Sequence, residues 1–289
     1  MLRHDKTKQQ LIKRIKRAAL TWTGKQWALD NIDYLMKPMV LLGSSKKVEK
    51  GLKKKIITKV MYLFPHNAIS LITLCAGAKS AGCAEGCLYQ SGQLGMPVGR
   101  DAMAKRTVLM ILFPKRFRAA LINEIARAYE RHGDALAIRL NGTSDVDFSE
   151  VIKANPQVRH YDYTKLYNRV LKNDLPNYHL TYSGSAFNAR SIKNTARAIN
   201  AGVNTALAFN TKQLNDEFKI PGTLSDFDET DLRFFDQAGS VGALTRKGSS
   251  RAQRSAENNR DSFFFNPKSF EKLNSLIATD RGNQNERLN

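Results

Sequence analysis

The sequence predicts an α/β protein: a partial or complete βα barrel with parallel strands, preceded by a basic helical N-terminal segment. Three observations lead to this prediction. In the second half of the chain, short apolar runs alternate with helix-length segments; polar residues follow each run; and positive charge is concentrated in the first fifth. With 289 residues, of which 42% are hydrophobic, the chain is long enough to bury a substantial core.

The apolar runs recur from Gly133 onward, at residues 134–145, 158–165, 178–185, 204–210 and 239–248. Between the first four lie segments with helix-compatible composition, at residues 148–156, 166–174 and 187–202. Strands that alternate with helical segments are typical of βα units and a parallel sheet. A doubly wound open sheet is the alternative arrangement of the same elements.

Polar side chains follow each predicted strand. In parallel α/β proteins, ligands bind at the carboxyl ends of the strands. The candidate catalytic residues at these ends are Asn141, Asp145, Asp162, Lys165, Ser183 and Lys247. Each of them is also compatible with an ordinary loop or capping role: Ser144, Asp145 or Asp147 would serve as the N-cap of the helix that follows.

The strand at residues 158–165 has two different faces. Tyr161 and Tyr163 lie on one face, whereas His160, Asp162 and Thr164 lie on the other, because side chains alternate along a strand. If the polar face looks into the barrel, Asp162 and Lys165 would bind a polar ligand. If the aromatic face does, the tyrosines would fill the interior.

All three cysteines lie in one segment rich in Gly, Ala and Ser. Cys75, Cys83 and Cys87 have the spacing C-x7-C-x3-C. Three thiolates could hold a 4Fe-4S cluster with one iron open to a small-molecule cofactor, and small neighbouring residues let backbone amides approach the cluster. Structural zinc, completed by one of the five histidines, is an alternative metal. Three thiols buried in the core are the simplest alternative.

The first 59 residues carry 16 Lys or Arg against 4 acidic residues, which is +12 of the formal +20 charge of the chain. Leu11, Ile12 and Ile15 fall on one face of a predicted helix with cations around them, and Trp22 and Trp27 are available for stacking on bases. A polyanion such as DNA or RNA is the expected partner. The alternative is that these are solvated faces whose apolar stripe packs on the main domain. The candidate phosphate-binding residues are Lys13, Arg14, Lys16, Arg17, Lys53, Lys54 and Lys55.

The remaining features narrow the class of protein. The predicted organisation is a basic helical arm at 1–59, a cysteine loop with a barrel-like domain at 60–265, and a C-terminal helix with a polar tail at 266–289.

We expect no membrane partner, because no apolar run approaches the length of a membrane span. The odd cysteine count and the lack of a signal peptide lead us to expect a reducing cytoplasm. We find no P-loop, G-x-S-x-G or H-E-x-x-H motif.

An ordered series of motifs resembles a bacteriophage group, the gene product 88 family. The motifs are the cysteine loop at 75–87, Arg106 with Thr107, and residues 139–145, 161–165, 178–185, 231–236 and 241–248. The resemblance covers about residues 70 to 265. It implies a phage protein in which a cysteine loop precedes a barrel-like α/β domain, and the expected compartment would then be the host cytoplasm. That order looks like radical S-adenosylmethionine enzymes, although their usual spacing is C-x3-C-x2-C.

Two hypotheses for function follow. The first is a phage iron-sulfur enzyme, similar in architecture to radical S-adenosylmethionine enzymes, that acts on nucleic acid or a nucleotide and would use S-adenosylmethionine as cofactor. The second is a basic nucleic-acid-binding protein of phage replication, packaging or regulation, without catalysis, in which the cysteine loop holds a structural metal or cluster.

Overall fold

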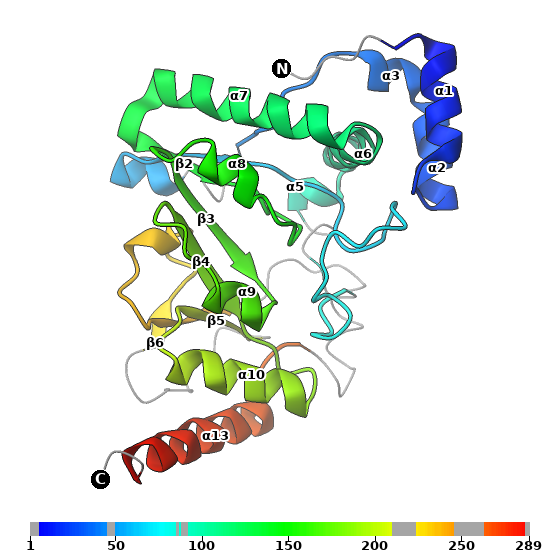
Figure 1. Ribbon diagram of the computed structural model, residues 1–289. Coiled ribbons are helices and arrows are strands. Elements are labelled where there is room, and N and C mark those ends of the chain that lie inside the picture. Colours follow the sequence, from blue (N-terminus) through cyan, green and yellow to red (C-terminus); the bar gives the residue numbers. More distant parts are fainter. Residues whose placement is uncertain are drawn as a thin grey trace. The chain divides into compact units, whose positions relative to one another are not determined.

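The computed structural model describes residues 6–44, 50–84, 87, 92–209, 224–245 and 263–286 (Figure 1). The chain divides into two compact units. The first comprises Met1–Ala76, Leu88–Asp162 and Leu175–Tyr178, and the second comprises Gly77–Cys87, Tyr163–Asp174 and His179–Asn289. The cysteine segment is therefore shared, with Cys75 in the first unit and Cys83 and Cys87 in the second.

Seven strands form one sheet with the order β1-β2-β3-β4-β5-β7-β6. All the strand pairs for which a register is defined are parallel. The order follows the chain from β1 to β5 without the reversal that characterises a doubly wound sheet. The two end strands of this order, β1 and β6, are not neighbours in the sheet, so the sheet does not close on itself. The fold is therefore a partial βα barrel, and the predicted fold class is confirmed. The strands are β1 (Ile57–Val60), β2 (Leu136–Arg139), β3 (Arg159–Thr164), β4 (Tyr178–Ser183), β5 (Thr205–Phe209), β6 (Leu224–Asp226) and β7 (Val241–Thr245).

Two of these strands were not among the predicted apolar runs. β1 begins at Ile57, inside the segment 1–59 that the sequence assigns to the basic helical arm. Its Lys59 lies between the buried Thr58 and Val60, so a charged residue interrupts the short apolar pattern. β6 is three residues long and pairs only with β7 among the described residues. Strands this short carry little periodic signal.

The N-terminal helices of the first unit cluster beside α6 (Pro97–Leu112) in Figure 1. They are α1 (Lys8–Arg17), α2 (Trp22–Asp30) and α3 (Ile32–Met36). Thr7 begins α1 with a capping box, in which its hydroxyl accepts a hydrogen bond from the Gln10 amide. Leu11 and Ile15 are fully buried, so the apolar stripe of α1 packs inside this unit. Lys53 and Lys54, two of the predicted phosphate-binding residues, lie in the short 3-10 helix η1 (Lys50–Lys54), which ends two residues before β1 begins.

The long helix α7 (Pro114–His132) packs against β2. Its Glu124 is buried, and the carboxylate accepts hydrogen bonds from the amides of Leu41 (3.0 Å) and Leu42 (2.8 Å). Beyond Leu42, Gly43 exchanges two backbone hydrogen bonds of 2.8 Å with Val60. This antiparallel bridge covers the outer edge of β1. The other elements of the first unit are α5 (Gly92–Gly95), η3 (Gly133–Ala135) and α8 (Ser149–Lys153).

In the second unit, α10 (Ala189–Asn200) and α13 (Pro267–Glu286) lie side by side against β5 and β7 (Figure 1). Phe209 of β5 is central, with ring centroids 6.1 Å from Phe265 and 5.8 Å from Phe270. Phe265 makes one parallel bridge to Phe209 just before α13 begins. The unit also contains α9 (Tyr167–Leu171) and η4 (Arg233–Phe235). Among the described residues of the whole chain, no helix combines the length and hydropathy needed to cross a membrane.

The motif at residues 231–236 has a structural role. Arg233 is buried, and its guanidinium lies 3.7 Å from the ring centroid of Phe227 and 3.2 Å from a carboxylate oxygen of Asp236. Phe227 in turn covers β7 at Gly242, where a Cβ atom would lie 2.0 Å from the ring. Glycine at position 242 is therefore required for the packing of this segment on β7.

The two faces of β3 can now be assigned. Lys59 lines a pocket with residues of α7, and Lys59, Ile138 and His160 are in register across β1, β2 and β3. The polar set of β3 therefore begins on the face toward α7, and Tyr161 lies fully buried on the opposite face.

His160 is 0% exposed, and its Nδ1 lies 2.9 Å from the carbonyl oxygen of Val158. Burial is the main reason that its pKa falls to about 4, although the bond to Val158 acts in the opposite direction.

His160 makes the stability of the protein depend on pH. Between its ordinary pKa of about 6.5 and the folded value of about 4, the unfolded chain binds a proton that the native protein does not. The stabilisation is complete above pH 6.5 and is lost as the pH falls toward 4, by about 3 kcal/mol at most. Urea unfolding at a series of pH values should show this loss in the wild type and a flatter profile in His160→Gln. The exposed His179→Gln is the control, and equal slopes in both variants would contradict the prediction.

Candidate functional site

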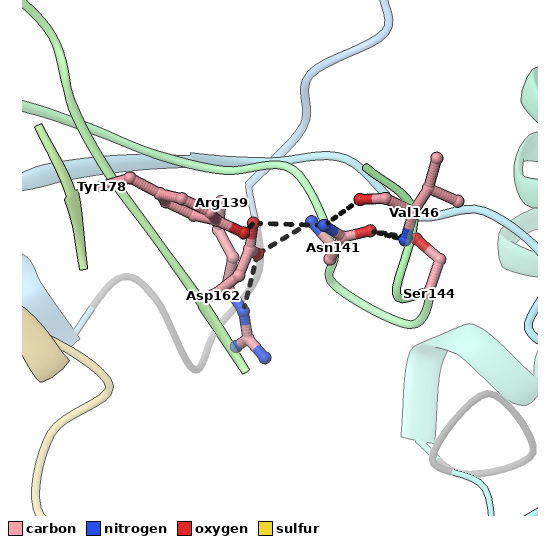
Figure 2. Close-up of polar contacts among 6 residues, drawn as sticks. All are labelled: Arg139, Asn141, Ser144, Val146, Asp162 and Tyr178. Atoms are coloured by element: carbon pink, nitrogen blue, oxygen red, sulfur yellow. Dashed lines mark hydrogen bonds and ion pairs between the residues drawn. The ribbon is translucent and has the colours of Figure 1, made fainter. Parts of the chain in front are cut away.

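A buried carboxylate organises the carboxyl ends of the strands in the first unit. Asp162 of β3 is 0% exposed. Its oxygens accept hydrogen bonds from the Asn141 amide (2.8 Å), from the Asn141 side chain (3.3 Å) and from the Tyr178 hydroxyl (3.2 Å). The Arg139 Nε lies 4.0 Å from one carboxylate oxygen of Asp162. Figure 2 draws these contacts. These contacts offset the cost of burying the charge, so Asp162 acts as a positioning residue for the segment after β2.

The side chain of Asn141 also forms hydrogen bonds within the loop that follows β2 (Figure 2). Its side-chain oxygen accepts hydrogen bonds from the Ser144 hydroxyl (2.9 Å) and the Val146 amide (2.8 Å), and its side-chain nitrogen donates to the Val146 carbonyl (3.0 Å). An amide can donate and accept at once, which neither a carboxylate nor an apolar side chain can do here. Asn141 therefore holds residues 141–146 in one conformation.

The loop held by Asn141 binds the first cysteine. The Asp145 amide donates to the Leu74 carbonyl (2.7 Å), and Cys75 and Asp145 form a parallel bridge. The Cys75 thiol donates to the Thr143 carbonyl, with 3.6 Å between sulfur and oxygen. The Thr143 hydroxyl donates to the carbonyl of Leu63, which follows β1 (2.6 Å). Cys75 thus lies at the carboxyl ends of β1 and β2.

Thr107, one residue of the Arg106–Thr107 motif, supports the same edge. Its buried hydroxyl accepts a hydrogen bond from the Phe64 amide (2.9 Å), in the segment that leads from β1 to the cysteines. Burial lowers the pKa of the neighbouring Arg106 guanidinium, an effect opposed mainly by Tyr34 and Glu124.

In the second unit, the segment that leads to Cys83 is attached to the carboxyl end of β4. The Ser185 hydroxyl donates to the Ala81 carbonyl (2.8 Å), and the Ser191 hydroxyl of α10 donates to the Ser80 carbonyl (3.2 Å). Lys165, which follows β3, donates to the Gly184 carbonyl (2.9 Å). The Cys83 thiol donates to the Ala78 carbonyl, with 3.7 Å between the two atoms. Side chains at strand ends thus hold this segment too.

Two glycines explain why the cysteine segment consists of small residues. Gly82 has a φ of +65° and packs against Phe187, so a Cβ atom would lie 2.2 Å from the ring. At Gly77, a Cβ atom would lie 2.6 Å from Cβ of Lys165. Each glycine permits a close approach between the segment and another part of the second unit, in addition to any role in approaching a cluster.

The three predicted cofactor ligands, Cys75, Cys83 and Cys87, are half-buried thiols in the structure. Cys87 lies between residues outside the described part of the chain. Within the described part, no group of three or more His, Cys, Asp or Glu side chains is arranged to hold a metal ion. Ser183 ends β4 and is half-buried, as is Lys165, whose ammonium lies 5.0 Å from the Phe263 ring centroid. Lys247 lies outside the described residues.

The capping alternatives for the loop after β2 can be separated. The Asp147 carboxylate accepts a hydrogen bond from the Ser149 amide (2.8 Å) at the start of α8. The Asp145 backbone is paired with Leu74, and Ser144 donates to Asn141. The N-cap of α8 is Phe148, which makes no side-chain capping bond, so none of the three predicted caps is the N-cap. Asp147 supports the first turn from one position earlier, and Asp145 stays next to Cys75.

Burial also affects a tyrosine next to the edge residues of the second unit. Tyr182 of β4 is buried, and desolvation raises its pKa to about 12, with a hydrogen bond to Thr195 acting in the opposite direction. Its ring meets that of Tyr167 edge to face, with 6.1 Å between centroids. This pair of rings fills space beside Ser183, and the raised pKa keeps the Tyr182 hydroxyl neutral at physiological pH.

The predicted phosphate-binding residues differ in whether their side chains also make contacts inside the protein. Lys13, Lys16, Arg17 and the three lysines 53–55 are exposed. Arg14 has a structural contact, because its Nε donates to the Leu112 carbonyl (2.6 Å) and its guanidinium lies 4.6 Å from the Phe113 ring centroid. Trp27 is likewise engaged, donating to the Asp101 carboxylate (3.0 Å), whereas Trp22 is 80% exposed.

Sequence reasoning missed Arg139 and Tyr178, the partners of Asp162. Arg139 is the one charged residue in the apolar run LAIRL at residues 136–140, and the sequence could have indicated it as a partner for a buried carboxylate. Tyr178 comes from β4, so only the folded chain shows that it meets β3.

Removal of the Asn141 side chain should release the loop that holds Cys75. Asn141→Ala leaves Asp162 with fewer donors and Ser144 and Val146 without their acceptor, which should cost about 3 kcal/mol of unfolding free energy. Urea denaturation measures the loss, and thiol modification followed by peptide mapping should show faster reaction of Cys75 relative to Cys83. Asn168→Ala, at an exposed position of α9, is the control and should change stability by less than about 0.5 kcal/mol. Equal stability of the two variants would contradict the assigned role.

Comparison with known proteins identifies a family for this chain. The family model described as gene product 88 matches residues 39–261, a range that includes β1 to β7, the three cysteines and the Asp162–Asn141 contacts. No curated protein and no solved structure matches the chain. Since the family model matches well over half of the sequence, the chain belongs to the phage gene product 88 family.

Proposed function

We propose that this protein is an iron-sulfur enzyme in which Cys75, Cys83 and Cys87 hold a 4Fe-4S cluster, acting on nucleic acid or a nucleotide. The observation that supports the proposal best is the attachment of the cysteine segment to strand ends. In the first unit, Cys75 pairs with Asp145 after β2, and in the second unit, Ala81 is bound by Ser185 after β4. Carboxyl ends of parallel strands are where α/β enzymes bind their ligands.

The donor chemistry of these residues fits a cluster. The three thiols are half-buried, which suits a group that must be shielded from water yet reached by a second molecule. In the structure, Cys75 and Cys83 donate their protons to backbone carbonyls, and these protons would leave on binding. With three protein ligands, a cluster supplies an iron that is open to a chelating molecule such as S-adenosylmethionine.

The remaining strand-end residues fall into two groups. Asp162 and Asn141 position the loop next to Cys75. Asp145, Lys165 and Ser183 are half-buried and could bind polar groups of a cofactor or substrate by hydrogen bonds. Their backbones are held by the sheet and its loops, so a ligand would meet side chains whose positions are already set.

Metal analysis tests the proposal. Protein reconstituted anaerobically with iron and sulfide should contain about four of each per chain and absorb at about 400 nm. Cys75→Ser should lower the iron content and the absorbance, whereas Lys79→Ala, an exposed change in the same segment, should leave both unchanged. Under reduction, the loaded protein should convert S-adenosylmethionine to 5′-deoxyadenosine. Colourless protein with one bound zinc would contradict the proposal.

A second candidate function is nucleic-acid binding without catalysis, with the cysteines holding a structural metal or cluster. The exposed cations of α1 and the exposed Trp22 ring favour it, since phosphate contacts and base stacking together bind single strands. Protein that carries a cluster and binds oligonucleotides but never cleaves S-adenosylmethionine would favour this candidate.

The contribution of α1 can be measured by substitution. Because β1 begins at Ile57, deletion of residues 1–59 would also damage the sheet. Lys13→Ala/Lys16→Ala/Arg17→Ala should weaken binding of a single-stranded oligonucleotide and reduce the salt slope of log Kd by about 2. Trp22→Ala should weaken binding with little change in that slope. Fluorescence anisotropy at several salt concentrations gives both values. An unchanged slope in the triple variant would show that α1 does not contact phosphates.

A further inference from the structure

A cationic pocket lies between α7 and β1 in the first unit. It has a volume of about 480 Å³ and is lined by Val40, Leu42, Lys59, Glu124, Arg127, Ala128, Arg131 and His132. None of these residues belongs to the carboxyl-edge contacts around Asp162 and Cys75. The size falls within the range of small-ligand sites in proteins.

The charges in this pocket are unbalanced. Lys59, Arg127 and Arg131 bring three positive charges, against one carboxylate, that of Glu124. Both oxygens of Glu124 already accept hydrogen bonds from the backbone amides of Leu41 and Leu42. The only other titratable group among the described lining residues is His132, which adds positive charge when it is protonated.

The position of Arg131 and His132 in the last turn of α7 has a simpler partial explanation, because cations stabilise a helix C-terminus. That explanation does not cover Lys59, which comes from a strand, or Arg127, one turn earlier on the same helix face. Like charges four residues apart on a helix repel each other. An anion between these cations would remove the repulsion and satisfy guanidinium donors, of which Arg131 uses its Nε for the Arg127 carbonyl (3.2 Å).

We infer that this pocket binds a phosphate group, at a site separate from the cysteine segment. Arg127 and Arg131 would hold the phosphate oxygens with their planar donors, and Lys59 would approach from β1 as a point charge. The buried side chains of Leu42 and Ala128 would contact an apolar part of the ligand. The phosphate belongs either to a nucleic-acid strand or to a small phosphorylated molecule, and the site chemistry is the same for both.

Two probes test the inference on the full-length protein: inorganic pyrophosphate by calorimetry, and a fluorescein-labelled single-stranded 20-mer by anisotropy. Arg127→Ala/Arg131→Ala removes two exposed cations from the pocket. Lys115→Ala/Lys153→Ala removes the same charge from exposed positions outside it and is the matched control. Thermal unfolding confirms that both variants fold, and Lys59→Gln, on the opposite wall, should reproduce the effect of the arginine changes.

Weakening of pyrophosphate binding by about tenfold in the pocket variant but not in the control supports the site and assigns it to a small phosphorylated ligand. If only the oligonucleotide is affected, with a salt slope lower by about 1 than in the control, the phosphate belongs to a strand. Equal binding of both probes to the pocket variant and the control overturns the inference. Iron content should be the same in all these variants, so failure of the iron-sulfur proposal and failure of this one are distinguishable.

Discussion

The burial of one negative charge, on Asp162, determines the arrangement of the carboxyl edge in the first unit. A carboxylate removed from water must be compensated by donors, and here they come from the backbone and side chain of Asn141, from Tyr178 and from nearby Arg139. Since these groups come from β2, β4 and the loop after β2, the charge fixes their relative positions. Asn141 extends the order to Val146, and the loop in turn binds Cys75.

The second unit uses neutral hydrogen bonds for the same purpose. Ser185 and Ser191 bind consecutive carbonyls of the cysteine segment, and Lys165 fixes the turn at Gly184. Polar residues at strand ends therefore have a structural role here before any role in ligand binding. The requirement for glycine at positions 77 and 82 follows, because the segment approaches Lys165 and Phe187 too closely for any side chain.

Much of the fold could be predicted from sequence, since β2, β3, β4, β5 and β7 lie in apolar runs of strand length separated by helical segments. β1 could not, because Lys59 breaks a pattern only four residues long. The candidate residues Asn141 and Asp162 were identified from their positions after strands, but their partnership with each other and with Tyr178 depends on register and strand order. The cationic pocket could not be predicted for the same reason: Lys59 and Arg127 are distant in sequence and come to line one pocket only in the folded chain, where α7 packs against β2 beside β1.

A barrel that does not close leaves its first and last strands with hydrogen-bonding groups that another chain could use. On β1 this exposure is limited, because Gly43 occupies both the amide and the carbonyl of Val60, and the strand has only four residues. Lys59 adds a charge at the same margin. Edge-to-edge association of two copies through β1 would have to displace residues 41–43. It would also remove the amides that donate hydrogen bonds to the buried Glu124 carboxylate. The segment before β1 thus protects this edge of the sheet against self-association.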